Sequence, residues 1–287
     1  MAAVVAVTTP RARGLSATLL KRVLTAAVGI PLFVWIVVGA PRWVFTLLIV
    51  ALSALAAWEL MRMFERAGRG GYPRLAVVGA VAVTASFAAP ALMDNVSTPA
   101  IVLTFVFALT LSAPVWVDAA PRVEPVVSTL LAVVYVGWLL GHGLLLDALP
   151  NGAALVLLLV GTTWAGESAA YGVGSLVGRH PLAPVISPRK TVEGAAGQLV
   201  FSIAAAAVLG AWLLPQWSVS MTIFAGAVLG FVGQIGDLAE SVMKRSLGAK
   251  DTGGLVPGHG GVLDRLDGLL FNAPALFYYA SWVGGRG

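Results

Sequence analysis

The sequence contains no cysteine among its 287 residues. This absence excludes disulfides, thiolate metal sites, iron–sulfur clusters and cysteine nucleophiles, so any metal must be bound by oxygen or histidine. Charged residues are also scarce at 11%, whereas hydrophobic residues make up 59%, and the mean hydropathy is +0.91. A soluble domain carries roughly 25% charged residues, so this chain lacks the polar surface that a soluble core needs. The composition predicts an integral membrane protein.

Apolar stretches of about 20 residues, the length that a spanning helix needs, recur along the whole chain. We therefore predict an all-α, polytopic helical bundle with about nine transmembrane helices. The expected spans are 23–40, 43–61, 75–93, 99–117, 125–147, 152–175, 194–214, 219–243 and 266–284.

Basic residues are strongly segregated between the two sides of these spans. Of the 18 lysines and arginines, only Arg42 and Arg286 fall on one side, and the other 16 lie in the N-terminus and in alternate loops. Positive charge marks the cytoplasmic face, so the N-terminus is expected inside. The net charge of +5 then reflects membrane topology, and no nucleic-acid partner is expected.

The chain divides into a cytoplasmic lead-in (1–22), N-terminal transmembrane helices (23–150) and a C-terminal region (151–287) that holds most of the unusual polar groups. Residues 1–22 and the apolar run after them could be a signal peptide. The run is longer than a typical signal core, so we expect an uncleaved first helix. Neither an internal repeat nor a soluble domain is evident.

Glu167 is an ionisable residue within the expected span 152–175. Such a group is costly in a membrane and usually faces a partner or a wet cavity, which favours a functional role. Around it, Gly166, Ala170, Gly174 and Gly178 are spaced four apart. Small residues at this spacing let another helix approach closely, and packing alone explains them.

The stretch SPRKTVEG, residues 187–194, reads as a cytoplasmic turn leading into the next helix. Thr191 can cap that helix, and Arg189 and Lys190 place two cations at its N-terminus. A helix N-terminus beside cations is a suitable anion site. The alternative is that these are ordinary juxtamembrane basic residues.

Acidic residues gather between positions 193 and 267, which hold six of the chain's thirteen: Glu193, Asp237, Glu240, Asp251, Asp264 and Asp267. Asp237, Glu240, Ser241 and Lys244 share one helical face because they lie three or four residues apart. Carboxylates beside basic groups suggest a hard cation whose other ligands are phosphate oxygens. The alternative is a charge cluster at a helix start, with the remaining acids in surface ion pairs.

His259 lies in the glycine-rich segment PGHGG, residues 257–261. This segment lacks the G-K-[ST] ending of a Walker A loop, and its glycines allow tight turns and close approach to a ligand. His259 could be a general base, a phosphate donor or a structural hydrogen-bonder. His142 and His180 are isolated, and we expect them to be structural.

The 27 residues from Ser241 to Asp267, SVMKRSLGAKDTGGLVPGHGGVLDRLD, resemble the signature of the phosphatidate cytidylyltransferases, also called CDP-diacylglycerol synthases. That signature is S-x-x-K-R, then K-D, then P-G-H-G-G-x-x-D-R-x-D. SPRKTVEG is similar to the family element S-P-x-K-T-x-E-G. The nine-span layout extends the resemblance over nearly all of the chain, although residues 1–150 match only in character.

The resemblance implies transfer of CMP from CTP to phosphatidic acid, giving CDP-diacylglycerol and pyrophosphate. It implies Mg²⁺ as cofactor, with a second metal or a monovalent cation left open, CTP and phosphatidic acid as partners in the lipid bilayer, and a homodimer. The site would face the cytoplasm at a plasma membrane, where acyl chains stay in hydrocarbon while the lipid phosphate meets CTP.

The resemblance also assigns roles to individual residues. Asp237, Asp264 and Asp267 correspond to metal-site aspartates, with Lys244 and Arg245 as catalytic cations. Substrate-binding positions are Ser187, Lys190, Thr191, Ser241, Lys250, Asp251, His259 and Arg265. One departure occurs in WAGESAAY, where Glu167 stands at the place of the family's usual Asp, so it would position metal or nucleotide with a side chain one methylene longer.

Two other functions are compatible with parts of the sequence. A CTP-dependent lipid kinase would transfer the γ-phosphoryl group to an alcohol and would need a base for the hydroxyl. The lipid phosphate, by contrast, is already an anionic nucleophile, so His259 is expected only to bind. A secondary transporter could also carry acids in its spans, but transporters usually show internal repeats and a site near the membrane midplane.

Overall fold

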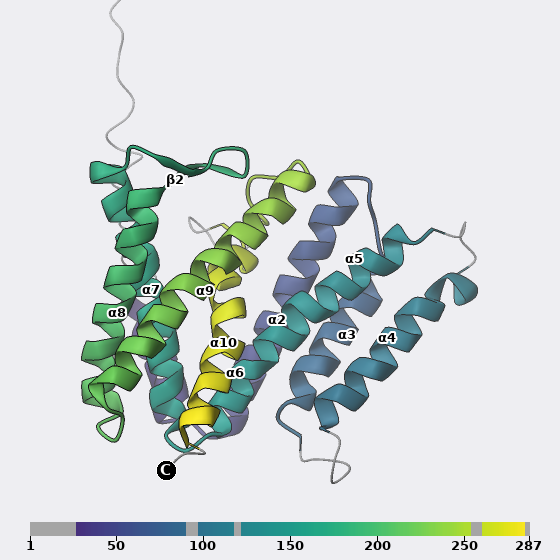
Figure 1. Cartoon of the computed structure of the whole chain (residues 1–287). Coiled ribbons are helices and arrows are strands. Elements are labelled where there is room, and N and C mark those ends of the chain that lie inside the picture. Colours follow the sequence, from purple (N-terminus) through teal and green to yellow (C-terminus); the bar gives the residue numbers. More distant parts are fainter. Residues whose placement is uncertain (1–26, 90–96, 118–121, 254–259, 285–287) are drawn as a thin grey trace, which may run out of the picture.

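The chain is almost entirely helical in a computed structural model that describes residues 27–89, 97–117, 122–253 and 260–284. Its helices form one bundle that carries a short β-hairpin at one end (Figure 1). After an apolar helix over Ala27–Val38, the elements are α2 (Arg42–Arg66), α3 (Pro73–Ser86), α4 (Thr98–Trp116), α5 (Glu124–Ala132), the π-helical η1 (Val133–Trp138), α6 (Leu139–Ala148), α7 (Gly152–Val177), β1 (Pro181–Ala183), β2 (Ser187–Thr191), α8 (Val192–Leu213), α9 (Val219–Ser246) and α10 (Leu263–Gly284).

Each expected span corresponds to a helix in the described part of the chain, with ends shifted by a few residues. The segments α5, η1 and α6 run on without a break and together form one of these spans. Within the described residues, six helices are long and apolar enough to cross a membrane: Arg42–Arg66, Thr98–Trp116, Glu124–Ala148, Gly152–Val177, Val192–Leu213 and Val219–Ser246. The protein is therefore an all-α, multi-pass membrane protein.

The hairpin refines the turn expected at residues 187–194. Strand β1 pairs with β2 in antiparallel register, with Pro181 opposite Thr191 and Ala183 opposite Ser187. Thr191 ends β2 and is also the N-cap of α8, because its hydroxyl accepts a hydrogen bond from the Gly194 N–H at 3.1 Å. The predicted cap is thus confirmed, and it joins the hairpin rigidly to α8.

Glycines bring the helices of the second half close together. A Cβ atom at Gly226 of α9 would lie 2.7 Å from the Ile203 Cα of α8, and one at Gly236 would lie 2.7 Å from the Asp267 carbonyl oxygen of α10. Gly174 of α7 faces Gly194 at the start of α8, and Gly178, directly after α7, faces Thr191. The small-residue stripe of α7 therefore packs against α8, as small residues do between membrane helices.

The expected structural role of His142 is consistent with its surroundings. Its side chain is buried among the rings of Phe87, Trp138 and Phe277. Its Nδ1 atom lies 2.8 Å from the Trp138 carbonyl oxygen, so both the ring and its polar atoms are accommodated by the core.

One end of the bundle carries the elements that hold the predicted site residues. The ends of α2, α7 and α9 and the hairpin all lie at this end, whereas α10 ends on the opposite side (Figure 1). Helix α10 starts deeper in the bundle than the point where α9 ends. Leu263 and Leu266 of its first turn are therefore buried, whereas Arg265 is exposed.

Candidate active site

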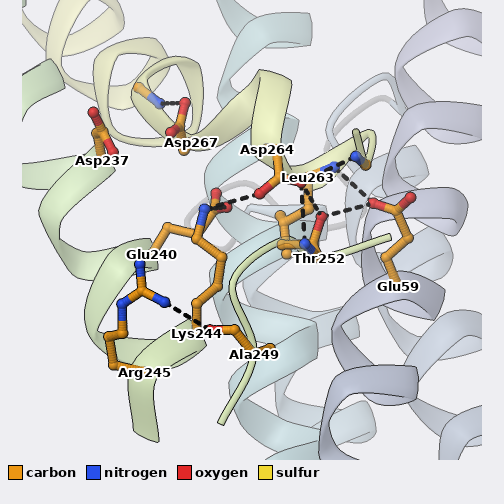
Figure 2. A network of polar contacts seen from close by, with 12 residues as sticks. Glu59, Asp237, Glu240, Lys244, Arg245, Ala249, Thr252, Leu263, Asp264 and Asp267 are labelled. Atoms are coloured by element: carbon orange, nitrogen blue, oxygen red, sulfur yellow. Dashed lines mark hydrogen bonds and ion pairs between the residues drawn. The ribbon is translucent and has the colours of Figure 1, made fainter. Parts of the chain in front are cut away.

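The predicted site residues come from four elements that meet at the hairpin end of the bundle. Helix α9 supplies Asp237 and Lys244, α10 supplies Asp264 and Asp267 (Figure 2), and α7 and the hairpin add Glu167 and Lys190. Residues that are far apart in the sequence thus converge on one region.

Lys190 of β2 forms an ion pair with Asp237 of α9, with 2.6 Å between Nζ and Oδ2. Both side chains are about a quarter to a third exposed, at 25% and 31%. The pair connects the hairpin to the acidic face of α9, a contact that the sequence did not indicate. A cation and a carboxylate held together at a water-accessible position can both reach an incoming ligand.

A cavity of about 240 Å³ opens beside this pair, between α7, the hairpin, α8 and α9. Its polar lining includes Glu167, Arg189, Lys190, Gln234 and Asp237. Of the two surroundings expected for Glu167, a partner or a wet cavity, the structure places it at a cavity. Because two cations and two carboxylates line it, the cavity suits an anionic ligand accompanied by a metal ion.

Gln234 was not singled out from the sequence, although an amide within an apolar span is an unusual polar group. Its Nε2 atom donates a hydrogen bond to the Ala195 carbonyl at 2.8 Å, which connects α9 to α8 beside the cavity. The side chain is therefore fixed rather than free to rotate.

Glu167 reaches the second turn of α10. A Cβ atom at Gly268 would lie 2.6 Å from Glu167 Oε1, closer than real Cβ contacts. Gly268 thus leaves the space that the Glu167 carboxylate occupies, directly after Asp267 in the chain. The extra methylene of Glu167 is accommodated by the absence of a side chain on the opposing helix.

Lys244 is held between two carboxylates rather than projecting into solvent. Its Nζ atom lies 3.0 Å from Glu240 Oε1 and donates a hydrogen bond to Asp264 Oδ1 at 2.8 Å. The Lys244 side chain is only 13% exposed, and the Glu240 side chain is fully buried. Two acids therefore offset its charge and fix its position, leaving one of its three N–H donors for another partner.

The second carboxylate oxygen of Asp264 organises the loop between α9 and α10 (Figure 2). Asp264 Oδ2 accepts hydrogen bonds from the backbone N–H groups of Thr252 and Gly261, both at 3.0 Å, and from Thr252 Oγ1 at 2.9 Å. Beside Gly261, Gly260 has φ +85°, a conformation that glycine adopts readily. Asp264 is thus a centre of local structure as well as a predicted ligand.

Glu59 of α2 belongs to this network and was missed by the sequence analysis. Its Oε2 atom accepts a hydrogen bond from the Leu263 N–H at 2.9 Å and lies 3.3 Å from Thr252 Oγ1. The residue is 1% exposed. A signal existed, because Glu59 is an ionisable residue inside an expected span, as Glu167 is.

Arg245 connects the hairpin to the loop that follows α9. Its Nε atom donates to the Ile186 carbonyl at 3.1 Å, and its Nη1 atom donates to the Ala249 carbonyl at 3.2 Å. A side chain engaged with two carbonyls holds the backbone in place, so the structure gives Arg245 a supporting position beside the site.

The remaining predicted residues occupy varied positions. Ser241 is buried, and Ser187 begins β2. Lys250, Asp251 and Arg265 are exposed. His259 and residues 254–258 of the signature lie outside the described residues, as do residues 1–22.

The three predicted metal ligands, Asp237, Asp264 and Asp267, do not form one cluster in the described residues. In the described ranges, no three His, Asp or Glu side chains lie close enough together to hold a metal ion. Asp237 and Asp267 lie on neighbouring helices where α9 and α10 are closely packed (Figure 2). Asp237 pairs with Lys190 through Oδ2, whereas both carboxylate oxygens of Asp264 are engaged, with Lys244 and Thr252. Mg²⁺ commonly takes one or two carboxylates and completes its shell with water and substrate phosphates. The Asp237 and Asp267 pair fits that donor set.

Comparisons with known proteins identify the family. The sequence profile described as "Cytidylyltransferase family" matches residues 20–283. Three relatives carry the name phosphatidate cytidylyltransferase. The Synechocystis protein is 43% identical over 132 residues, 45% of this chain and 44% of its own length. The Staphylococcus saprophyticus protein is 38% identical over 147 residues, 51% and 56% respectively, and the Mycobacterium bovis protein is 39% identical over 160 residues, 54% and 49%. The chain spans about half the length of these relatives.

Proposed function

The chain belongs to the cytidylyltransferase family, and from this premise we propose that it transfers the cytidylyl group of CTP to phosphatidic acid. The products are CDP-diacylglycerol and pyrophosphate. The names of the Synechocystis, Staphylococcus and Mycobacterium relatives support this choice of acceptor.

The observation that carries the proposal is the cavity lined by Glu167, Arg189, Lys190 and Asp237 at one end of a membrane bundle. A lipid substrate requires such a position, because its acyl chains stay in hydrocarbon while its phosphate reaches a water-soluble nucleotide. The paired charges at the cavity suit the triphosphate. Its oxygens bind to basic side chains and to a metal ion that carboxylates hold.

Cytidylyl transfer needs no protein nucleophile. A phosphate oxygen of phosphatidic acid attacks the α-phosphorus of CTP, and the bond from that phosphorus to the bridging oxygen breaks, so that pyrophosphate leaves in line. Both reactants are polyanions, so repulsion between them is the main obstacle. Arg189 and Lys190 offset this repulsion at the cavity. Lys244, whose charge Glu240 and Asp264 offset, keeps one N–H donor for a phosphate oxygen.

We also propose that Mg²⁺ assists the reaction. Asp237 and Asp267 would hold it, and Asp264 is the third predicted ligand once its contact with Lys244 loosens. The metal would stabilise the negative charge that develops on the transferred phosphoryl group and on the departing pyrophosphate.

The proposed location is a bacterial plasma membrane, with nine spans, the N-terminus inside and the site facing the cytoplasm. The segregation of 16 basic residues on one side supports this orientation. A homodimer belongs to the same proposal and rests on the family resemblance.

The test uses the purified full-length protein in mixed micelles with phosphatidic acid, MgCl₂ and CTP labelled separately at the α and γ phosphates. We expect label from the α position in lipid and label from the γ position in pyrophosphate. Label from the γ position in lipid would instead indicate a kinase, and lipid free of both labels would contradict group transfer to phosphatidic acid. Asp267→Asn is the matched control, because the amide keeps the size of the side chain and removes its charge.

A further inference from the structure

Glu59 belongs to the first half of the chain, but its carboxylate lies beside residues of the signature in the second half, Thr252, Gly253, Gly261 and Leu263. It is 1% exposed and sits on α2, two turns before that helix ends. A buried carboxylate is unfavourable unless hydrogen bonds compensate for its lost hydration. The hydrogen-bond partners of Glu59 therefore indicate its role.

The first partner is the start of α10. Glu59 Oε2 accepts the hydrogen bond of the N–H of Leu263, the first residue of that helix, at 2.9 Å. The first N–H groups of a helix have no partner inside the helix, and a carboxylate there also interacts favourably with the helix dipole. Glu59 acts as a cap supplied by a different helix, so it fixes where α10 begins.

The second partner is Thr252, whose hydroxyl lies between two carboxylates. Thr252 Oγ1 is 3.3 Å from Glu59 Oε2 and 2.9 Å from Asp264 Oδ2. Because a hydroxyl carries a single proton, the two carboxylates contact each other through one shared group. Asp264 in turn binds Lys244, so a continuous polar chain runs from α2 to α9 (Figure 2).

Two glycines of the signature leave room for the Glu59 carboxylate. A Cβ atom at Gly253 would lie 2.6 Å from Glu59 Oε1, and one at Gly261 would lie 2.7 Å from Glu59 Oε2. Either side chain would push the carboxylate away from its partners. Glu59 thus accounts for Gly253, and Glu59 and the Thr252 hydroxyl together account for Gly261.

We propose that Glu59 is a positioning residue for cytidylyl transfer. It fixes the first turn of α10, and through Thr252 it orients Asp264, so that Asp264 and Asp267 keep their places opposite α9. This inference rests on the proposed function for its catalytic consequence. A displacement of about 1 Å in a reacting site can lower a rate on the order of 100-fold, so a remote cap of this kind is expected to affect turnover strongly.

The test compares variants that keep or remove the two hydrogen-bonding groups, in the full-length protein and under the assay conditions above. Glu59→Gln keeps an oxygen acceptor and should retain most activity. Glu59→Ala and Thr252→Val should each lower kcat/KM by about tenfold or more. The double variant should be little worse than either single variant, because both changes act through the same carboxylate.

Ser53→Ala is the matched control. Ser53 lies on the same helix and is buried, and its hydroxyl accepts a hydrogen bond from Thr84 Oγ1 at 2.8 Å, away from the signature loop. It should lower thermal stability slightly without lowering kcat/KM, which separates a general loosening of α2 from a loss of positioning.

Hydrogen–deuterium exchange supplies a readout that does not depend on turnover. Exchange in peptides covering 260–268 should rise in Glu59→Ala and stay near that of the wild type in Glu59→Gln and Ser53→Ala. Unchanged exchange and unchanged kcat/KM in folded Glu59→Ala would overturn the proposal, as would full additivity with Thr252→Val.

If wild-type protein transferred no cytidylyl group, the proposed function would fail, while the exchange data would still decide whether Glu59 orders the start of α10. If Glu59→Ala did not fold, equal loss of activity in Glu59→Gln and Ser53→Ala would also overturn positioning.

Discussion

At the scale of single residues, the position of Glu167 depends on the missing side chain of Gly268. We predict that Gly268→Ala lowers kcat/KM, because the new Cβ would lie 2.6 Å from Glu167 Oε1 and would displace the carboxylate from the cavity. Because Oε1 is the far end of a flexible side chain, the carboxylate can move aside, so we expect a larger loss of activity than of stability. Steady-state kinetics of the purified variant would measure the loss.

The same geometry predicts a specific rescue. Glu167→Asp shortens the side chain by one methylene, so the Gly268→Ala/Glu167→Asp double variant should regain much of the lost activity. Melting temperatures of the three variants control for general destabilisation. A double variant less active than Gly268→Ala alone would show that contact between these two positions does not set the place of the carboxylate.

Which site residues could be predicted depends on how local their signals are. Thr191 was predicted as a helix cap because a cap and its partner lie three residues apart. Glu167 was recognised because a charge inside a span stands out. The bond between Glu59 and Leu263 joins residues 204 positions apart, and no local pattern encodes such a pairing. The same holds for Lys190 and Asp237, which were both singled out but not as partners.

At the scale of elements, Arg245 attaches the hairpin to α9 together with the Lys190–Asp237 ion pair. We predict that Arg245→Lys loosens this attachment, because a single ammonium group cannot reproduce the fork that donates to both Ile186 and Ala249. Loss of about 1 kcal/mol per hydrogen bond should raise the KM for CTP about fivefold.

Limited trypsin digestion followed by mass spectrometry would check this prediction independently. Cleavage after Arg189 should accelerate in Arg245→Lys. Arg179→Lys serves as control, because Arg179 contributes a backbone N–H to its bond with Glu193. Equal cleavage rates in wild type and Arg245→Lys would contradict a role of Arg245 in holding the hairpin.

Helices and irregular elements differed in how well they could be predicted. Long apolar runs predicted the helices because the backbone N–H and C=O groups of a membrane-spanning segment must be hydrogen-bonded within that segment. The hairpin could not be recognised, because its strands have three and five residues and a pattern that short does not separate a strand from a turn. The π-helical turn η1 was also missed, since hydropathy does not distinguish one helical hydrogen-bond register from another.

At the scale of the whole molecule, the absence of cysteine permits a direct test of topology by single-cysteine labelling. We predict that a cysteine that replaces Arg69 or Val185 reacts with a membrane-impermeant maleimide only from the cytoplasmic side. Cysteines at Asn151 and Gln216 should react only from the outside, because these positions lie in exposed loops between successive helices. Labelling in intact and in opened cells gives the readout, and retained activity shows that each variant is folded.

The sequence yields a prediction for the side of the membrane on which each loop lies, but it yields none for the neighbours of each helix. Basic residues act one by one on orientation, so counting them suffices. Which helices touch depends on matched surfaces, such as Gly226 against Ile203, and a single sequence does not state such matches. The fold was therefore predictable as a list of spans rather than as an arrangement.

The contact of Glu59 with Gly253 and Gly261 has a consequence for recombination among relatives. Exchanging the first half of this chain for that of another family member would remove Glu59 and leave Gly253 and Gly261 without the carboxylate for which they leave space. Chimaeras should tolerate a junction between α6 and α7 only when the incoming half carries a glutamate in register with position 59. A shorter side chain would leave the start of α10 uncapped, and a bulkier one would meet the loop. The two halves should therefore be exchangeable only together, although only the second half carries the signature.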